Sequence, residues 1–176
     1  SYCTREIADI GIRDYLRSSA TFRHCAKGWR VGVEFAPAAP LPALLPPYLL
    51  GLWLGDGNSD CAAISKPDPE IEQYVGEFIY AHGLTLRKQV CRSCPTLYIT
   101  ALPAWAGPGP GGNPVRQLLR AYGLLGNKHI PHAYKTASRQ DRLQLLAGLI
   151  DSDGAVAHGG CDWITSREPL AQDFAY

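Results

Sequence analysis

Residues 146–154 read L-A-G-L-I-D-S-D-G and residues 49–57 read L-L-G-L-W-L-G-D-G, so one nine-residue pattern occurs twice. Each copy is an apolar stretch with small residues four positions apart, and each ends in Asp-Gly. Residues four apart share one face of a helix, and small residues on that face let two helix backbones approach closely. The repeat therefore predicts two matching helices whose close contact brings the carboxylates of Asp56 and Asp153 together at one end.

These two carboxylates are candidates for a metal site. Carboxylates held close together raise each other's pKa unless a cation lies between them. Mg²⁺ (or Mn²⁺) suits such a site, because it takes oxygen ligands and keeps waters and substrate phosphates bound. The ion would activate water and stabilise the charge that develops on phosphorus. We therefore predict that Asp56 and Asp153 are metal ligands and catalytic residues. The alternative is that each Asp only closes its helix with the following Gly. Asp151 has no acidic counterpart in the first copy, so we expect it to have a structural role.

Three ordered blocks resemble one known family. Residues 146–154 look like the motif of the LAGLIDADG (dodecapeptide, DOD-type) homing endonucleases, and residues 49–57 are similar to the first motif of the endonucleases inside inteins. The block N-K-H-I-P at 127–131 resembles the lysine-bearing block before the second motif. Residues 21–35 resemble the segment that leads into the first motif in fungal, eukaryotic-type inteins. On this resemblance the chain is identified as a fragment of an intein endonuclease region.

The resemblance implies an α+β fold, the LAGLIDADG homing endonuclease fold of pseudo-symmetric αββαββα repeats, with the second repeat truncated. It divides the chain into four parts. Residues 1–35 are a lead-in segment from the splicing or connecting region, and 36–47 are a proline-rich linker. Residues 48–137 are the first repeat, and 138–176 are the start of an incomplete second repeat.

The function that this resemblance implies is site-specific cleavage of double-stranded DNA by hydrolysis of phosphodiester bonds, within a self-splicing intein. Lys128 would act as a catalytic lysine near the scissile phosphate. Arg87, Lys88 and Arg92 would contact DNA from a strand pair, although a one-residue slip of register would invert which of them face the groove. We expect the isolated 176-residue chain to be inactive.

Other functions remain open on the sequence. The chain could be a degenerate, inactive endonuclease remnant, a non-cleaving nucleic-acid-binding domain of the same fold, or a structural domain whose Asp-Gly motifs only end helices. The expected partners are the double-stranded DNA target and the exteins of the host protein, with no membrane. The expected location is intracellular, in the nucleus if the source is eukaryotic.

Composition agrees with a globular protein, because 46% of the residues are hydrophobic and 19% are charged. The net charge of +1 is small but unevenly distributed. Residues 54–82 hold six acids and one lysine, whereas residues 83–142 hold nine Lys or Arg and one acid. The basic stretch predicts an electrostatic footprint on phosphate, and the alternative is an ordinary solvated surface. Of six cysteines, only Cys91 and Cys94 have C-x-x-C spacing, and we expect free thiols at a hairpin turn.

Local patterns predict the elements around the two motif helices. Pro46 and Pro47 suit a helix start, and Gly57 is expected to end that helix in the left-handed conformation. Ser138 and Asp141 have the spacing of a capping box, which predicts the second motif helix from 139 to 151. The other predicted helices cover 69–82, 115–122 and 168–176, and the predicted strands cover 30–35, 61–65, 84–90, 96–100, 155–156 and 162–165.

Overall fold

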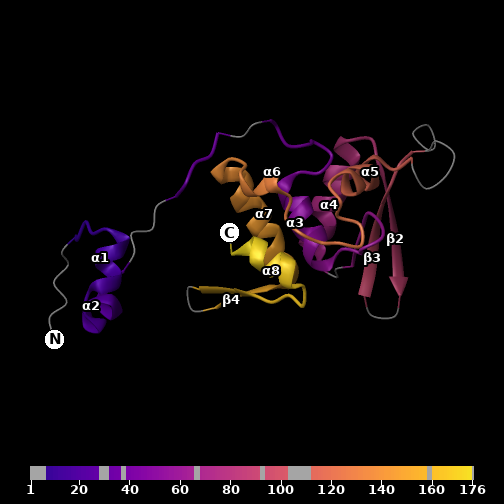
Figure 1. Cartoon of the computed structure of the whole chain (residues 1–176). Helices are drawn as coiled ribbons and strands as arrows, with labels where there is room; N and C mark the ends of the chain where they lie inside the picture. Colours follow the sequence, from indigo (N-terminus) through magenta and orange to yellow (C-terminus); the bar gives the residue numbers. More distant parts are fainter. Residues whose placement is uncertain are drawn as a thin grey trace. The chain divides into compact units, whose positions relative to one another are not determined.

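The computed structural model describes residues 7–27, 32–36, 39–65, 68–91, 94–102, 112–157 and 160–175. The chain divides into two compact units, Ser1–Val33 and Glu34–Tyr176, which are described separately (Figure 1).

The first unit contains two short helices, α1 (Ile12–Arg17) and α2 (Ala20–Cys25). The hydroxyl of Ser19 caps α2 by accepting a bond from the Phe22 N–H at 3.1 Å. Neither helix has a buried residue, and Ile12 and Leu16 are well exposed. The strand predicted for 30–35 does not form over residues 32–35, and residues 30 and 31 lie outside the described part.

The second unit is built on the two motif helices, α3 (Pro47–Asp56) and α7 (Arg139–Asp153), which pack side by side. Both predicted helices are confirmed. The Ser138 hydroxyl accepts a bond from the Asp141 N–H at 3.1 Å and also lies 2.7 Å from its carboxylate, so the predicted capping residues do pair. One expectation was wrong. Gly57 ends α3 in an extended conformation with φ −74°, not a left-handed one.

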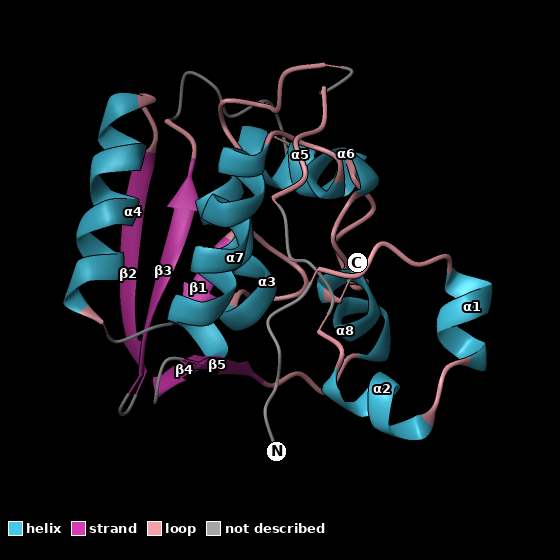
Figure 2. Ribbon diagram, turned by 90° about the vertical axis from the view of Figure 1, so that its left-hand side faces the viewer, coloured by secondary structure: helices cyan, strands magenta, loops and turns pink. Residues whose placement is uncertain are grey.

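A three-stranded antiparallel sheet lies beside α3, with strand order β1-β3-β2. Its strands are β1 (Ala63–Ser65), β2 (Thr85–Cys91) and β3 (Cys94–Thr100). Helix α4 (Pro69–Ala81) packs against β2 and buries the predicted stripe of Ile71, Val75, Phe78 and Ile79. Figure 2 shows α4 next to β2 and β3, and the α3–α7 pair next to these strands.

The register assigns the side chains of this sheet to two faces. Residues directly opposite each other across an antiparallel pair point to the same face, and successive residues alternate. Lys88 pairs with Leu97, which pairs with Ile64, so these residues share the face that carries the buried apolar side chains. We call this the covered face. Arg87 and Gln89 pair with Tyr98 and Thr96 on the opposite face. We call this the open face; Ala63, Ser65, Thr85 and Thr100 also lie on it.

The remaining elements complete the second unit. They are α5 (Pro114–Ala121), α6 (His132–Lys135), β4 (Gly154–Ala157), β5 (Gly160–Trp163) and α8 (Glu168–Phe174), with β4 and β5 forming a separate two-stranded sheet. Leu45, inside the predicted linker 36–47, is buried, and its carbonyl accepts a bond from the Tyr134 hydroxyl at 2.6 Å. The proposed subdivision at residues 47 and 137 stays a prediction.

Helices and antiparallel sheets occur together, so the described part of the chain is α+β. The pseudo-symmetric repeat fold inferred from the resemblance stays a prediction. Within the described residues, we find no helix with the length and apolar character that crossing a membrane would require.

Candidate functional site

The contact between α3 and α7 depends on the predicted small residues. A Cβ placed on Gly51 would lie 2.9 Å from the Cα of Gly148, closer than real Cβ atoms come to other heavy atoms. A Cβ on Gly55 would likewise overlap the side chain of Ser152. The backbones are therefore in contact at Gly51 and Gly148, and Ser152 packs against Gly55. These contacts confirm the predicted helix pairing and place the two C-terminal ends side by side.

This pairing brings the two predicted carboxylates to one end of the helices. A Cβ on Gly55 would lie 3.4 Å from Oδ2 of Asp153, so the Asp153 carboxylate lies against the last turn of α3. Asp56 is half-buried, and Asp153 is exposed. Both act electrostatically on Lys128, as described below. Asp56, Asp153 and Lys128 are thus neighbours, while their catalytic roles stay predictions.

Lys128 is buried, with only 5% of its surface exposed. Its Nζ donates three hydrogen bonds, to the carbonyl oxygens of Leu54 and Gly55 at 3.0 Å each and of Gly57 at 2.7 Å. These carbonyls belong to the C-terminal end of α3, where the helix leaves acceptors unpaired and the helix dipole favours a cation. The ammonium also lies 5.1 Å from the centre of the Trp53 ring. Lys128 therefore caps the helix that carries Asp56.

Burial is the main cause that lowers the pKa of Lys128, from its ordinary value of 10.5 to about 8. The positive charge of Arg167 lowers this pKa further, and the charges of Asp153 and Asp56 raise it. The cluster therefore contains two acidic and two basic side chains. The repulsion between the two carboxylates, from which we predicted a metal, is already relieved in part by these cations.

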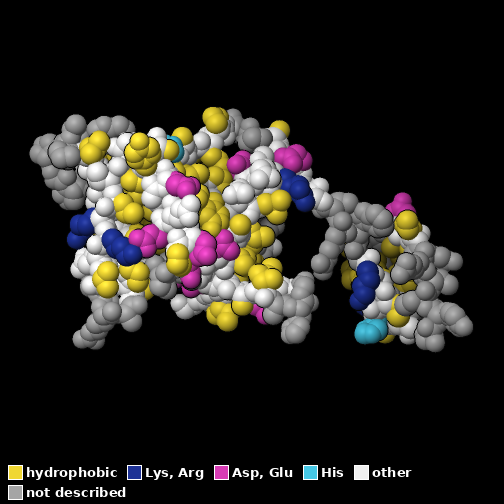
Figure 3. Space-filling view, turned by 180° about the vertical axis from the view of Figure 1, so that it is seen from behind, with side chains coloured by type: hydrophobic (Ala, Val, Ile, Leu, Met, Phe, Trp, Pro, Cys, Tyr) yellow, Lys and Arg dark blue, Asp and Glu magenta, His cyan; other side chains and the backbone are white. Residues whose placement is uncertain are grey.

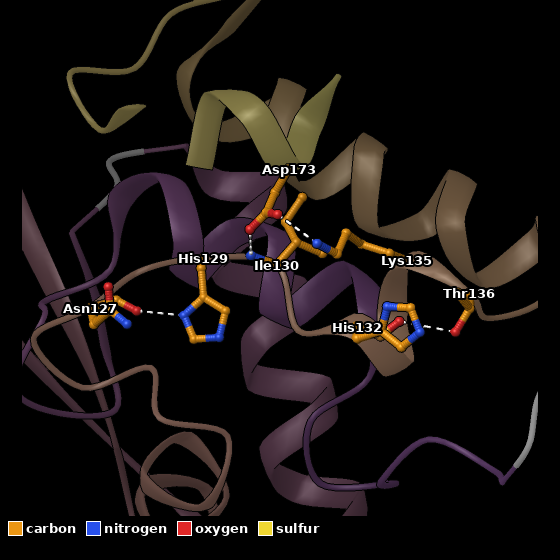
Figure 4. Close-up of polar contacts among 7 residues, drawn as sticks. All are labelled: Asn127, His129, Ile130, His132, Lys135, Thr136 and Asp173. Atoms are coloured by element: carbon orange, nitrogen blue, oxygen red, sulfur yellow. Dashed lines mark hydrogen bonds and ion pairs between the residues drawn. The ribbon is translucent and has the colours of Figure 1, made fainter. Parts of the chain in front are cut away.

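The segment that carries Lys128 is held in place by its backbone and by α8 (Figure 4). Gly126 adopts a positive φ of 72°, and its N–H donates to the carbonyl of Ser59 at 2.8 Å. The Asp173 carboxylate accepts bonds from the N–H of Ile130 at 2.9 Å and from Nζ of Lys135 at 2.6 Å. The ring of His129 lies 2.8 Å from the carbonyl oxygen of Asn127, and the backbone carbonyl of His132 accepts a bond from the Thr136 hydroxyl at 3.0 Å (Figure 4).

Sequence reasoning missed Arg167. Its guanidinium donates to the Ser59 hydroxyl at 3.1 Å and lies near enough to Lys128 to lower the pKa of that amine. No local pattern marks Arg167, because it lies 39 residues after Lys128 in the turn before α8. The predicted structural role of Asp151 is supported, since its carboxylate accepts a bond from the Tyr48 hydroxyl at 2.7 Å and joins α7 to α3. Burial and, to a lesser extent, this bond to Asp151 raise the pKa of Tyr48.

The donor chemistry of Asp56 and Asp153 suits a hard cation that keeps several waters, because Mg²⁺ is commonly bound through one or two carboxylates. Among the described residues, no group of three or more His, Cys, Asp or Glu side chains converges on a common point. A metal at this end of the helix pair would therefore rest on these two carboxylates alone.

The three residues predicted to contact DNA do not lie on one described surface of the structure. Arg87 lies on the open face, with its guanidinium 4.3 Å from the centre of the Tyr98 ring and 3.3 Å from Oε1 of Gln89. Lys88 lies on the covered face and forms an ion pair with Glu72 of α4 at 2.7 Å. Because the strand register places Arg87 and Lys88 on opposite faces of the sheet, it does not support the prediction that both contact DNA from one surface. Arg92 lies outside the described residues.

The three described lysines of the basic stretch 83–142 all have partners within the protein. Lys88 is paired with Glu72, Lys135 with Asp173, and Lys128 with three carbonyls. On the face shown in Figure 3, Lys and Arg side chains are few and lie apart, whereas acidic side chains gather near the centre. Lys88, Lys128 and Lys135 therefore have partners within the protein, and the electrostatic footprint of the whole stretch stays a prediction.

Comparison with known proteins changes the identification. No family model matches the chain. A stretch of 133 residues, 75% of the chain, is 36% identical to a protein described as the replicative DNA helicase DnaB of Mycobacterium intracellulare. The chain spans 18% of the length of that protein. The identification as a LAGLIDADG homing endonuclease of an intein, and the DNA-cleaving function that followed from it, are therefore corrected. The similarity found is to a replicative helicase, and nothing found supports an endonuclease.

Proposed function

We propose that this chain is a nucleic-acid-contacting part of a DnaB-like replication protein, an enzyme that acts on DNA without being an endonuclease. The observation that supports the proposal is the 36% identity over three quarters of the chain to a replicative DNA helicase. The chain contains no G-x-x-x-x-G-K-[ST] sequence, so the proposal concerns DNA contact and not nucleotide binding. The expected intracellular location goes with this proposal, because the partner is DNA.

The open face of the sheet is the surface that we propose for this contact. Apart from the buried Ala63, the side chains named for this face are hydroxyls, an amide, a phenol and one guanidinium, which are groups that bond phosphate and base edges. Arg87 and Gln89 are both exposed and lie next to each other on β2. Arg and Gln are well suited to read purine edges, through bidentate bonds to guanine and adenine.

The test compares two neighbouring basic residues on opposite faces. Binding of a fluorescein-labelled 20-base-pair duplex is measured by anisotropy for the unaltered chain, Arg87→Ala and Lys88→Ala. We expect Arg87→Ala to weaken binding by about 1–3 kcal/mol if Arg87 contacts a base, or to reduce the salt dependence by roughly one ion if it contacts phosphate. Lys88→Ala should leave affinity almost unchanged, because its charge is already paired with Glu72. Equal effects of the two substitutions, or no binding by the unaltered chain, would contradict the proposal.

We also propose that Asp56 and Asp153 bind Mg²⁺ or Mn²⁺ weakly. The support is their proximity at the joined ends of α3 and α7 and the exposure of Asp153, which leaves room for the waters that Mg²⁺ retains. Mn²⁺ should broaden the NMR signals of residues 54–57 and 152–154 at micromolar concentrations. Asp153→Asn should abolish this broadening, whereas Asp151→Asn serves as the control, since Asp151 bonds to Tyr48. Uniform broadening over all acidic side chains would reject the site.

A further inference from the structure

Helix α8 lies next to the β4–β5 hairpin (Figure 1), and a cavity of about 330 Å³ opens between this helix and the end of β5. Its lining residues are Trp163, Ile164, Thr165, Ala171 and Phe174. The rings of Trp163 and Phe174 are half-buried and stacked, with centres 4.7 Å apart and planes at 18°. Pockets for small molecules begin at roughly 300 Å³, so this cavity has room for one ring system.

Two hydrogen-bond donors in the wall of this cavity can still take an acceptor. The indole N–H of Trp163 is buried and has no partner among the described residues, and a buried donor without a partner is destabilising. The hydroxyl of Thr165 accepts a bond from the Arg167 N–H at 3.3 Å, which leaves its own proton to donate. The wall therefore combines aromatic surface with donors, and this combination suits a flat ligand that carries acceptors on its edge.

An unpaired nucleobase fits this combination better than an apolar side chain of a protein partner does. An apolar side chain would fill the cavity but would leave both donors without an acceptor. A base has a flat face that stacks on aromatic side chains, and carbonyl or ring-nitrogen acceptors at its edge. Because that face is accessible only when the base is unstacked, the ligand is a single strand and not a duplex.

Arg167 is placed to bind the phosphate that accompanies such a base. Its backbone N–H bonds to Thr165, so the residue begins at the wall of the cavity. Its guanidinium is exposed and uses one donor for the Ser59 hydroxyl at 3.1 Å. A guanidinium has five donors in a fork that matches phosphate oxygens, so others remain for a phosphate.

The acidic side chains nearest in sequence do not close this site to a phosphate. Asp162 alternates with Trp163 along β5 and therefore points to the opposite face of the hairpin. The carboxylate of Asp173 accepts a bond from Nζ of Lys135 at 2.6 Å. The carboxylate of Glu168 accepts a bond from a side chain one turn along α8 at 3.1 Å. The charge of Arg167 therefore remains able to attract an anion.

We propose that this cavity binds one unpaired base of a single-stranded nucleic acid. The base stacks on the aromatic pair, and its edge accepts a bond from the Thr165 hydroxyl and, after a turn of the indole ring, from the Trp163 N–H. The adjoining phosphate bonds to Arg167. The site uses none of the residues of the open face, so it goes beyond the DNA contact proposed there and does not depend on it.

The first test follows the indole N–H signals of the whole chain by ¹H–¹⁵N NMR during titration with octathymidylate. The Trp163 signal should move, because its N–H gains an acceptor. The Trp53 signal is the internal control and should stay in place, since that N–H already donates to the Cys61 carbonyl at 2.9 Å. An abasic strand of eight deoxyribose phosphates should leave the Trp163 signal unchanged. Trp163→Phe identifies this signal by removing it.

The second test measures the affinity for fluorescein-labelled octathymidylate by anisotropy. Trp163→Leu should weaken binding by roughly fivefold to a hundredfold, the effect of losing one stacked base. Thr165→Val keeps the shape of the side chain, should weaken binding by a smaller factor, and keeps the test valid if Trp163→Leu does not fold. Arg167→Gln should reduce the salt dependence by roughly one ion. Tyr80→Gln removes an aromatic ring that is 90% exposed on α4, and it should leave the affinity unchanged.

Three results would overturn the proposal. The first is a Trp163 signal that does not move, or that moves equally with the abasic strand, which would leave only phosphate binding. The second is a loss for Tyr80→Gln as large as that for Thr165→Val. The third is a shift of the Trp163 signal with N-acetyl-leucinamide but not with octathymidylate, which would make the occupant an apolar side chain of a polypeptide. Because the Trp163 signal reports on this cavity, its response is independent of whether the open face binds a duplex.

Discussion

At the scale of single residues, Lys128 shows how a polar side chain can be buried at low cost. An ammonium has three donors and no acceptor, and all three donors of Lys128 have carbonyl partners at 2.7–3.0 Å. The same three bonds satisfy acceptors that α3 leaves unpaired at its C-terminal end. Lys128 therefore stabilises the turn that carries Asp56, whatever chemistry that carboxylate performs.

Replacing Lys128 should reveal this structural role. Lys128→Met keeps the length of the side chain and removes the three bonds, leaving buried carbonyls without a donor. We expect the free energy of unfolding to fall by about 1–3 kcal/mol, measured by urea denaturation. Lys88→Met is the control and should change it by less than about 1 kcal/mol, because the ion pair of Lys88 is largely exposed. Equal losses for the two variants would contradict the capping role.

The lowered pKa of Lys128 gives a second expectation. In protein labelled with ¹³C-lysine, the Cε signal of Lys128 should titrate with a midpoint near pH 8, below the ordinary lysine value of 10.5. The unfolded chain keeps its proton up to about pH 10.5, so between pH 8 and 10.5 it binds more protons than the folded chain. The contribution of Lys128 to the free energy of unfolding therefore rises with pH over this window.

This rise should appear as a growing difference between the unaltered chain and Lys128→Met from pH 8 to 10.5. Taking the difference cancels the tyrosines, whose raised pKa values act in the opposite direction above pH 10. A flat difference, or a midpoint near 10.5 for the Cε signal, would show that the amine is solvated.

At the scale of elements, the α3–α7 contact depends on glycine for space and not for backbone freedom. Gly51 and Gly148 lie in helices, where any residue adopts the required φ. Their need for glycine is that each faces the backbone of the other helix. Gly57 is similar, because a Cβ there would lie 2.6 Å from the Trp53 ring. The short distance between the two helix ends follows from these close contacts.

Gly51→Ala should therefore destabilise the second unit, although alanine is the better helix former. The helices must separate or shift, and we expect a loss of about 1–3 kcal/mol, typical of overpacked cores. Gly76→Ala is a matched control in α4, where a Cβ would meet nothing within 4 Å. This control should be stabilising by about 0.5–1 kcal/mol. Thermal denaturation followed by circular dichroism distinguishes the two, and a neutral Gly51→Ala would mean that the helices are not in backbone contact.

At the scale of the whole molecule, stability is distributed unevenly between the two units. All of the buried hydrophobic residues among the described positions lie between Leu45 and Leu170, in the second unit. The helices of the first unit are six residues each and bury none of their side chains. Short helices without tertiary packing have marginal stability in water, because their few hydrogen bonds do not offset the unfavourable free energy of helix nucleation.

Hydrogen exchange should separate the two units. We expect the amides of residues 12–25 to exchange with almost no protection, and those of Leu50 and Leu97 to exchange only through global unfolding. The measurement is exchange followed by mass spectrometry on the whole chain. Strong protection over residues 12–25 would show that the first unit is packed against a surface.

The sequence alone determined most elements of the second unit, although it did not predict α6. The apolar periods, the prolines at helix starts, and the Ser138 cap predicted α3, α4, α5 and α7 to within a few residues, because these signals act within one or two turns of chain. The small-residue repeat also predicted that α3 and α7 meet and bring Asp56 and Asp153 together, since close approach of two backbones requires small side chains on both. The function inferred from the same motif was wrong, because a motif describes helix packing more directly than it describes chemistry.

Only the tertiary structure decided which charged side chains are paired within the protein and which can contact a ligand. Lys88 and Arg87 are adjacent in sequence, yet strand alternation places them on opposite faces and leaves Lys88 paired with Glu72. Lys128, expected at the active site, is held by three carbonyls, and Arg167 joins it from 39 residues away. The sequence of α7 likewise does not show that its outward face is only half-buried, because the matching positions of α3 are also apolar and are fully covered. Burial and pairing depend on what packs from distant parts of the chain, and no local pattern records that.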